Sequence, residues 1–525
     1  MLRPLLLGQI ALLCSAAAAF AQAGAGRPVS LEEALELAEA SSEQVAMATA
    51  AVEQAGGQMA RARSDLFPQF AASVSYDRAL ASEFQNLFAS AGPPCPPFVP
   101  MPQGSVDQRL TELERAVDCG ATGAQAQEQD FSDLPFGRRN TWRASLTFSQ
   151  SLYSGGRIGA ATASARAGGE SARIGLAATR AQLELDVVGA YYDAALGQRL
   201  LEIADATYRQ AEATVQQVTL GYEAGSQPEF ELLRARVTRD NLRPAVIRQR
   251  AQRDLAQLRL RQLLDLPAAE SIVLTTALDS DTLPPPAPFA AQLAAAGQAV
   301  PPRAPVRQAD AAVQAATAAL DAARRQRWPS LSLDSSYGRV AYPSGFFPSL
   351  ARFRTNWTIG ATVQIPLFDG GRIRADEVVA RGGVSAARAQ LRLARDLAAL
   401  DTQSARDTLA AAEAVWQASA GTIAQAQRAF EIAEIRYREG VSTQLELSDA
   451  RLALVQAQTN RAQAARDLQV ARVRIALLPD LPFAATTGAV AVPAATPEPP
   501  APLLSAPQPP AGPPAVPGAP AGIQP

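Results

Sequence analysis

The segment WRASLTFSQSLYSGGRIGA, residues 142–160, is repeated as WTIGATVQIPLFDGGRIRA at residues 357–375. The offset is 215 residues, and Trp, Thr, Leu, Gly-Gly-Arg-Ile and the final Ala coincide. A second pair, GYEAGSQPEFELLRARV from Gly221 and RYREGVSTQLELSDARL from Arg436, keeps the same offset. Two matches at one offset, with no gap between them, indicate an internal duplication.

Upstream of these segments the duplication continues with a longer offset. Phe67-Pro68 matches Trp328-Pro329, and Tyr76 matches Tyr337, at an offset of 261 residues. The first copy therefore carries about 46 extra residues, which we interpret as an enlarged loop over residues 77–140 and not as a new domain.

The residues before each Gly-Gly-Arg-Ile alternate between apolar and polar types, as a half-exposed β-strand requires. One face carries Ile359, Ala361, Val363, Ile365 and Leu367 in the second copy, and Leu146, Phe148, Gln150 and Leu152 in the first. Each candidate strand is about ten residues long, the length that a tilted strand needs to cross a bilayer. The pattern predicts membrane strands, with a soluble hairpin as the alternative. Trp142 and Trp357 fit either an aromatic belt or a core role.

After each Gly-Gly-Arg-Ile, small or apolar residues recur at alternating steps of four and three, which is a heptad seam. No proline interrupts residues 156–227 or 371–478. A helix of about 65 residues spans roughly 100 Å, more than a globular domain needs. The rods break at Gly225 and Gly440, and return helices begin near Pro228 and Thr443, which predicts two antiparallel helical hairpins. Tyr222 is expected to pack in the first seam.

The composition argues against catalysis and against nucleic-acid binding. The 525-residue chain has no histidine, and its 48 basic residues are all arginine. The commonest general base, the commonest metal ligand and any Schiff-base lysine are therefore missing. A formal net charge of −2 provides no basic face for nucleic acid. We expect neither enzymatic activity nor a cofactor or metal site.

The N-terminus has the pattern of a secretory signal peptide over residues 1–23, with Arg3 before an apolar stretch from Leu5 to Ala19. Beyond it no run of about 18 apolar residues predicts a transmembrane helix. Two cysteines, Cys95 and Cys119, follow the signal peptide. In an oxidising compartment a disulfide between them is favoured over two free thiols.

These patterns predict five segments. They are a signal peptide (1–23), a first repeat (24–265), a linker or equatorial segment (266–299), a second repeat (300–482) and a tail (483–525). The tail is rich in proline and alanine, and we expect it to be disordered.

Over roughly residues 30–478 the chain resembles the TolC family of outer-membrane efflux proteins. The resemblance rests on Ser30-Leu31-Glu32-Glu33-Ala34-Leu35, on the two Gly-Gly-Arg-Ile strand exits and on the two Tyr-x-x-Gly helix breaks. It implies a mostly α fold with a small β part. The family forms a homotrimer with one shared twelve-stranded transmembrane β-barrel, four strands from each chain, continued by a long α-helical coiled-coil barrel in the periplasm.

The need to close a barrel argues for an oligomer independently of the resemblance. Two strand hairpins give four strands, whereas single-chain barrels start at about eight. Unpaired strand edges are not tolerated in lipid. The chain must therefore associate with further chains if its strands lie in outer-membrane lipid, although the number three comes only from the resemblance.

The resemblance places the functional residues at the two helix breaks. Glu231, Glu446 and Asp449 correspond to the acidic ring at the family's constriction, where carboxylates favour cations and bind multivalent ions. The alternative is that they are solvated carboxylates which stabilise helix starts. Tyr437 corresponds to a tyrosine that helps to hold the tip shut, but Ser442 stands where the family has its partner arginine.

The family meets its adapter protein at the same tips, so Gly225, Ser226, Gly440 and Val441 are the predicted adapter contacts. The predicted function is the exit duct of a tripartite efflux pump, which passively conducts small molecules or drugs. Its predicted partners are a periplasmic adapter and an inner-membrane efflux or ABC transporter. The alternatives are type I protein secretion and a periplasmic coiled-coil tether, although a tether would not need four alternating strands.

Overall fold

The computed structural model describes residues 27–81, 96, 98–118, 139–276, 278, 282–295, 302–343, 345–349 and 353–483. Contacts divide the chain into two units, residues 1–483 and 484–525, and every described residue belongs to the first. The predicted signal peptide, Cys95, Cys119 and the tail after Phe483 lie outside the described residues. The disulfide and the five segment boundaries therefore stay predictions.

Each repeat has the same order of a helix, two strands, a long helix and a return helix. The first repeat contains α3 (Glu43–Ser64), β2 (Gln69–Arg78), β3 (Asn140–Tyr153), α5 (Arg157–Glu223) and α6 (Glu229–Leu263). The second contains α8 (Ala304–Arg325), β5 (Ser330–Ala341), β6 (Arg354–Gln364), α9 (Arg372–Arg438) and α10 (Gln444–Leu477). This is the order that the duplicated sequence predicted.

Shorter elements lie before, inside and between the repeats. They are β1 (Arg27–Val29), α2 (Leu31–Ser41), α4 (Val106–Asp118), β4 (Ile272–Leu274), η2 (Ala287–Phe289) and α7 (Ala290–Ala295). β1 pairs in parallel with β4, and Tyr191 of α5 donates from its hydroxyl to Val29 O (3.1 Å) beneath them. Val29, Ile272 and Phe289 join the largest apolar cluster, so the segment between the repeats is anchored to the middle of α5.

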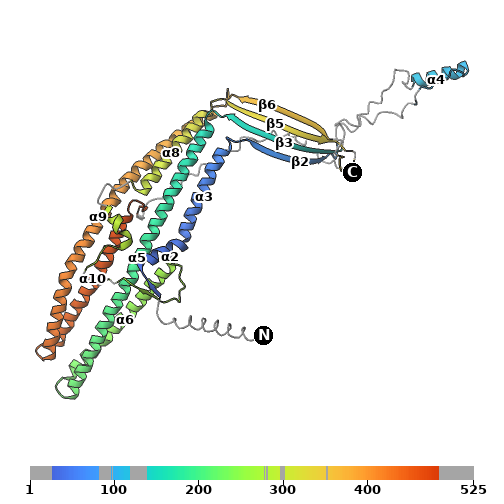
Figure 1. The fold of residues 1–525 in the computed structure, drawn as a ribbon. Helices are drawn as coiled ribbons and strands as arrows, with labels where there is room; N and C mark the ends of the chain where they lie inside the picture. Colours follow the sequence, from blue (N-terminus) through green and yellow to red (C-terminus); the bar gives the residue numbers. More distant parts are fainter. Residues whose placement is uncertain are drawn as a thin grey trace, which may run out of the picture. The chain divides into compact units, whose positions relative to one another are not determined.

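The long helices lie side by side in one layer (Figure 1). α5 packs against α3, α6, α8 and α10, and α9 packs against α8 and α10. The order across the layer is therefore α3 or α6, then α5, then α8 or α10, then α9. Both α5 and α9 have 67 residues, which corresponds to roughly 100 Å at about 1.5 Å per residue. The helices of the described segments include none long and apolar enough to span a membrane.

Small residues in the predicted seams let these helices approach closely. Ala194, Gly197, Leu201, Ala211, Val215 and Val218 of the predicted α5 seam are buried. A Cβ at Gly197 would lie 3.1 Å from Arg253 Cα of α6, so a larger residue there would push the hairpin apart. Tyr222, by contrast, is 43 % exposed, and the expectation that it packs in the seam was wrong.

The sheet has the order β2-β3-β5-β6, and all its pairs are antiparallel. The register aligns apolar side chains on one face, as in Phe70↔Phe148 and Leu146↔Tyr337↔Trp357. The other face is polar, and there Ser73 and Ser145 share a hydrogen bond (2.7 Å). This two-faced sheet is the one that the alternating sequence predicted.

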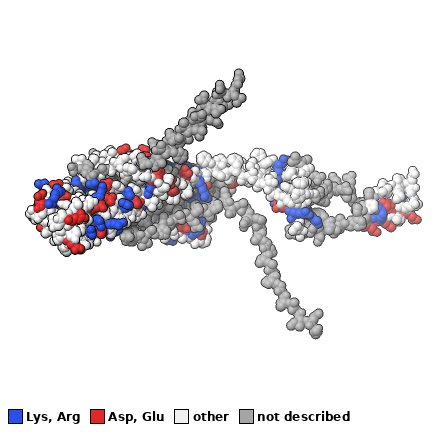
Figure 2. Space-filling model, turned by 90° about the horizontal axis from the view of Figure 1, so that it is seen from below, with Lys and Arg blue, Asp and Glu red and all other residues white. Residues whose placement is uncertain are grey.

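Charged side chains are few along the strands and frequent on the helices (Figure 2). Most charges of the sheet lie at the end far from the helices: Asp77, Arg78, Arg143, Arg339 and Arg354. Between that end and the helices, Asp334 on the polar face is the one charged residue of the four strands. An aromatic cluster of Tyr76, Trp142, Phe346 and Phe347 packs at the same far end.

The two Gly-Gly-Arg-Ile turns have the same backbone but different surroundings. Gly155 and Gly156 have φ of 63° and 85°, and Gly370 and Gly371 have φ of 66° and 89°, a region that L-residues disfavour. A Cβ at Gly155 would lie 2.7 Å from Trp328 Cβ, whereas nothing lies within 4 Å of one at Gly370. The first turn is packed against the second repeat, and the second turn is open.

Candidate functional site at the hairpin tips

The two hairpin tips are built by identical turns at the predicted glycines. Gly225 and Gly440 have φ of 72° and 74°, the left-handed conformation that ends many helices. Ser226 N–H donates to Gly221 O (2.8 Å), and Val441 N–H donates to Arg436 O (2.9 Å). Gly225, Ser226, Gly440 and Val441 are all exposed, so they are accessible for the predicted adapter contact, which stays a prediction.

Tyr437 lies where the two hairpins meet. Its ring packs against the α5–α6 cluster of Val215, Val218, Leu232 and Ala235, and against the α9–α10 cluster of Phe430, Leu447 and Leu454. Its hydroxyl is buried without a hydrogen-bond partner among the described residues. Burial raises the pKa of Tyr437, and the Glu231 carboxylate acts in the same direction. The phenol therefore stays neutral and contributes by packing.

Gln444 provides a polar link between the hairpins that the sequence analysis missed. It is only 3 % exposed. In the amide orientation that satisfies both groups, its nitrogen donates to Glu231 Oε2 (2.9 Å) and its oxygen accepts from Ala235 N–H (3.2 Å). A hydrogen bond to a charged group contributes more than a neutral one. Gln444 thus holds the start of α10 against the first turns of α6.

The three predicted carboxylates do not cluster within one chain. Glu231 is half-buried beside Gln444, whereas Glu446 and Asp449 are exposed. Glu446 lies 3.9 Å from Arg436 on its own hairpin. The part of the chain that the structure describes holds no group of three His, Cys, Asp or Glu residues suited to a metal ion. An acidic ring would need carboxylates from further copies, so it stays a prediction.

Ser442 and the neighbouring arginines do not connect the hairpins. Ser442 Oγ is buried and has no partner among the described residues. Arg436 pairs with Glu446 and Arg438 with Glu434, each at 3.9 Å and each within the second hairpin. Near the tips, the two hairpins of one chain are joined instead by the Gln444–Glu231 hydrogen bond and by the packing of Tyr437.

Arg451 is a second functional candidate that the sequence did not single out. It is 7 % exposed in the middle of the helical layer, and its Nη2 donates to Thr214 Oγ1 of α5 (3.3 Å). Burial lowers the pKa of Arg451, and the Glu434 carboxylate acts against this shift. Its Nε has no partner among the described residues. A buried charge with incomplete pairing is destabilising.

Arg303, at the start of α8, is also buried, but its guanidinium is fully paired. Its guanidinium donates to Leu478 O (3.0 Å) and Leu481 O (3.1 Å), and it pairs with Asp401. These contacts fix the end of α10 beside α8 and α9. Arg451, by contrast, is incompletely paired, so we expect it to weaken the packing between the hairpins and not to stabilise it.

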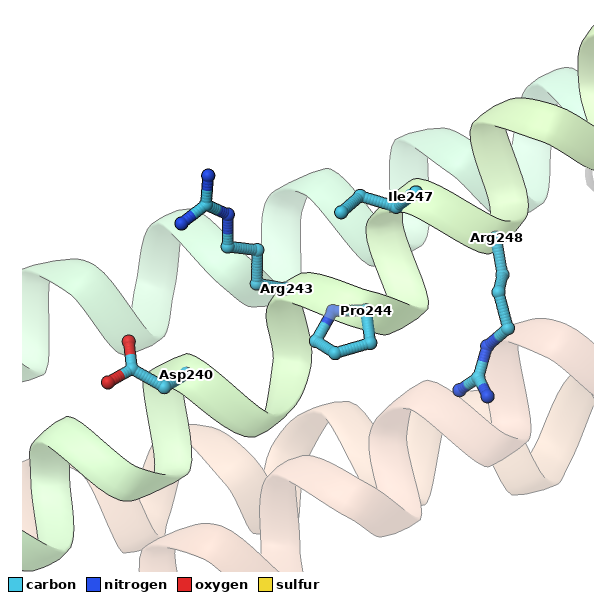
Figure 3. Close-up of a pocket in the computed structure, with 5 residues that line it drawn as sticks. All are labelled: Asp240, Arg243, Pro244, Ile247 and Arg248. Atoms are coloured by element: carbon cyan, nitrogen blue, oxygen red, sulfur yellow. The ribbon is translucent and has the colours of Figure 1, made fainter.

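Pro244 lies on the exposed side of α6 without ending the helix (Figure 3). Because proline has no N–H, the carbonyl of Asp240 loses its helical partner. A surface hollow of about 460 Å³ lies here, lined by Asp240, Arg243, Pro244, Ile247 and Arg248. Arg243 and Arg248 point to opposite sides of it, so no set of polar groups converges on a ligand there.

Comparison with known sequences identifies one family over both repeats. The sequence model of the family described as "Outer membrane efflux protein" matches residues 118–265 and 297–478. The pyoverdine export outer membrane protein OpmQ of Pseudomonas putida is 24% identical over 408 residues, which cover 76% of this chain and 82% of that protein. Outer membrane protein OprJ of Pseudomonas aeruginosa is 33% identical over 144 residues, 26% of this chain and 28% of that one.

Solved outer-membrane channels share the fold. VceC of Vibrio cholerae has a TM-score of 0.63 at 19% identity, covering 86% of this chain and 96% of its own. The CmeC outer membrane channel of Campylobacter jejuni has a TM-score of 0.64 at 15% identity, covering 86% of both chains. At these identities the likeness establishes the architecture of long helices beside a small sheet.

Proposed function

This chain belongs to the outer membrane efflux protein family, and from that premise we propose that three copies form the exit duct of a tripartite efflux pump. The family places the chain in the outer membrane as an efflux channel and not as an enzyme. In the proposed pump an inner-membrane transporter supplies the energy, and a periplasmic adapter connects it to the duct.

The observation that carries this proposal is that both layers of the fold are open at the same two edges. In the described segments the helical layer ends with α3 and α6 on one side and with α9 on the other. The sheet ends with β2 and β6. α3 leads into β2, so this edge of both layers belongs to the first repeat. β6 leads into α9, so the other edge belongs to the second repeat. Exposed strand edges cannot remain in lipid, so further copies must cover both.

The packed and open glycine turns support the same arrangement. Within the chain, Gly155 lies under Trp328 of the second repeat. The counterpart of Trp328 in the first repeat is Phe67, which is exposed. If the second repeat of one copy packs against the first repeat of the next copy as the two repeats of one chain pack together, Phe67 of the next copy covers Gly370. Such a ring alternates first and second repeats around one axis.

The sheet has the properties of a membrane segment. Its apolar face would meet outer-membrane lipid, and its polar face with Asp334 would line the lumen. The uncharged band of β3 runs from Ala144 to Tyr153, close to the roughly ten residues that a tilted strand needs. Trp142 and its aromatic neighbours then lie at the interface farther from the helices.

We assign the hairpin tips to gating and docking. Gly225, Ser226, Gly440 and Val441 would contact the adapter. Glu231, Glu446 and Asp449 of each copy would surround the axis, and Tyr437 with Gln444 would hold each second hairpin against the first. The support is geometric: the turns are exposed, and Gln444 already connects the two hairpins of one chain.

A low-molecular-weight cargo is favoured over the alternative of type I protein secretion. Two relatives are named for pyoverdine export and for fusaric acid resistance. The neighbouring genes test this choice, because a pump and adapter gene support efflux and a gene for a secreted protein supports secretion.

Conductance across planar lipid bilayers tests the duct and its ring. The purified chain should insert from detergent and pass cations in preference to anions. Replacing Glu231, Glu446 and Asp449 together by glutamine should reduce this preference and the block by multivalent cations. Glu53→Gln, an exposed carboxylate on α3, is the control that should change neither.

Two results would contradict these assignments separately. A chain that stays soluble and monomeric without detergent is no duct. A triple variant with unchanged selectivity rejects the acidic ring but leaves the duct in place.

A further inference from the structure

The enlarged loop of the first repeat contains a helix with no counterpart among the described residues of the second. α4 (Val106–Asp118) lies between β2 and β3 in the chain. β2 runs away from α3 and ends at Arg78, so the loop leaves the sheet at the end opposite the long helices. If the chain works as proposed, this end faces outward from the cell.

One side of α4 is covered by its own chain. Val99 N–H donates to Glu112 Oε1 (3.2 Å), and the Arg115 guanidinium donates to Pro96 O (3.4 Å). Arg115 also pairs with Glu112, which lowers the pKa of that carboxyl to about 2. Ala116 on this side is fully buried. These hydrogen bonds thus hold the segment before the helix along one side of α4.

An adjoining face, which lines a surface hollow together with residues 98–102, presents an apolar stripe with coiled-coil spacing. Val106, Leu110, Leu113 and Val117 are separated by four, three and four residues, and they are 78, 51, 45 and 55 % exposed. In heptad terms they occupy d, a, d and a. A lone helix of 13 residues is marginal in water. Residues 98–102 lie along one edge of the stripe but leave its four side chains 45–78 % exposed, so the stripe has room for a further helix.

Flanking charges indicate that the partner is a parallel copy of the same helix. Arg109 takes position g and Glu114 takes position e, five residues later. In a parallel pair g faces e of the next heptad, so Arg109 would meet Glu114 of the other copy. In an antiparallel pair that overlaps the whole stripe, g faces g and Arg109 would lie nearest Ala116 of the other copy, so this ion pair would be lost. Neither residue forms an ion pair within the described segments.

Cyclic symmetry supplies the parallel orientation without further assumptions. Copies related by rotation about one axis present the same helix in the same direction. The sequence places 14 residues between Ala81 and Pro96 and 20 between Asp118 and Arg139. At about 3.3 Å per residue each connection can span on the order of 50 Å, which is ample for three helices to meet.

We propose that the α4 helices of three copies pack through this stripe into a parallel bundle on the outer side of the sheet. The occupant of the apolar stripe is a second copy of this chain. The inference rests on the proposed trimeric duct, and it adds an interface formed by residues of the first repeat alone.

Cysteine cross-linking in the full-length protein tests the bundle. In a Cys95→Ser, Cys119→Ser background, Leu110→Cys should form disulfide-linked dimers on mild oxidation. Thr111→Cys, on the flank away from the stripe, should form far fewer. Arg109→Glu should reduce the Leu110→Cys product several-fold, and adding Glu114→Arg should restore it.

The oligomeric state of each variant is measured separately, by sedimentation in detergent. A trimer whose Leu110→Cys product does not exceed that of Thr111→Cys overturns the bundle and leaves the duct intact. A monomer overturns both. Quenching of a dye at Leu113→Cys by brominated lipid would show that the stripe lies on the membrane, and this too overturns the bundle.

Discussion

The two hairpins have matching sequences but unequal surroundings. α6 lies at the edge of the helical layer, whereas α10 lies between α5 and α9. Residues 215 positions apart differ accordingly: Glu229, Arg236 and Tyr222 are exposed, and their counterparts Gln444, Arg451 and Tyr437 are buried or half-buried. Equivalent positions in a duplicated chain therefore need not have equivalent environments.

At the other end of the long helices, beside the sheet, the first repeat is the one that is packed and the second is the one that is open. Gly155 of the first repeat is packed, and Gly370 of the second faces open space. The first repeat is thus interior at the glycine turn beside the sheet and peripheral at the hairpins, and the second repeat has the opposite arrangement. The surfaces left open in one chain are those that the next copy is proposed to cover.

The largest expected effect is at the glycine turns. Gly155→Ala combines left-handed strain of about 1–2 kcal/mol with overpacking against Trp328 of about 1–3 kcal/mol. Gly370→Ala should destabilise the assembled protein by a similar amount, because Phe67 of the next copy is proposed to lie there. Urea unfolding in detergent, followed by circular dichroism, measures both losses.

Gly225→Ala is the reference for strain alone, since its φ is 72° and nothing lies within 4 Å of an added Cβ. A loss at Gly370 as small as that at Gly225 would mean that no neighbour covers the second turn, and the proposed order of copies would be wrong.

A smaller effect is expected at the link between the hairpins. Gln444→Ala removes the hydrogen bond to Glu231 and should lower the free energy of unfolding by about 2 kcal/mol. It should also raise the resting conductance, because the second hairpin is held less firmly. Glu229→Ala, the exposed counterpart, should stay within about 0.5 kcal/mol. Equal effects of the two substitutions would remove Gln444 from the gate.

The smallest expected effect has the opposite sign. Arg451→Met replaces an incompletely paired buried cation by an apolar side chain, which should raise the free energy of unfolding by about 1 kcal/mol. Arg236→Met at the exposed counterpart should change it by less than about 0.5 kcal/mol. A large loss with Arg451→Met, seen in the same unfolding experiment, would mean that the hydrogen bond to Thr214 and the contact with the Phe430 ring outweigh the cost of burying the charge.

Most of the fold could be predicted because its signals are local. The heptad seams, the glycine breaks and the absence of proline predicted helices that the structure ends at Glu223 and Arg438. Pro244 lies in a return helix and leaves that helix continuous. The alternation before each Gly-Gly-Arg-Ile predicted strands whose two faces differ as expected.

The candidate site could be predicted only in part. The sequence located both tips, but it could not distinguish Arg451 from Arg236 or reveal Gln444, because burial depends on which helix lies alongside. Tyr222 was assigned to the seam by its spacing, yet in the last turn of α5 its side chain is left exposed. Spacing defines the face of a helix and not whether that face has a neighbour.

The sequence by itself determined the duplication, the length of the rods, the turns at Gly225 and Gly440 and the amphipathic strands. Each follows from residues close together in the chain, through periodicity or through backbone conformations that favour glycine. Only the tertiary structure decided that α10 is interior and α6 peripheral, that Gln444 connects the hairpins and that both layers stay open at two edges. These depend on contacts between residues more than 200 positions apart, as between Glu231 and Gln444, which local patterns do not specify.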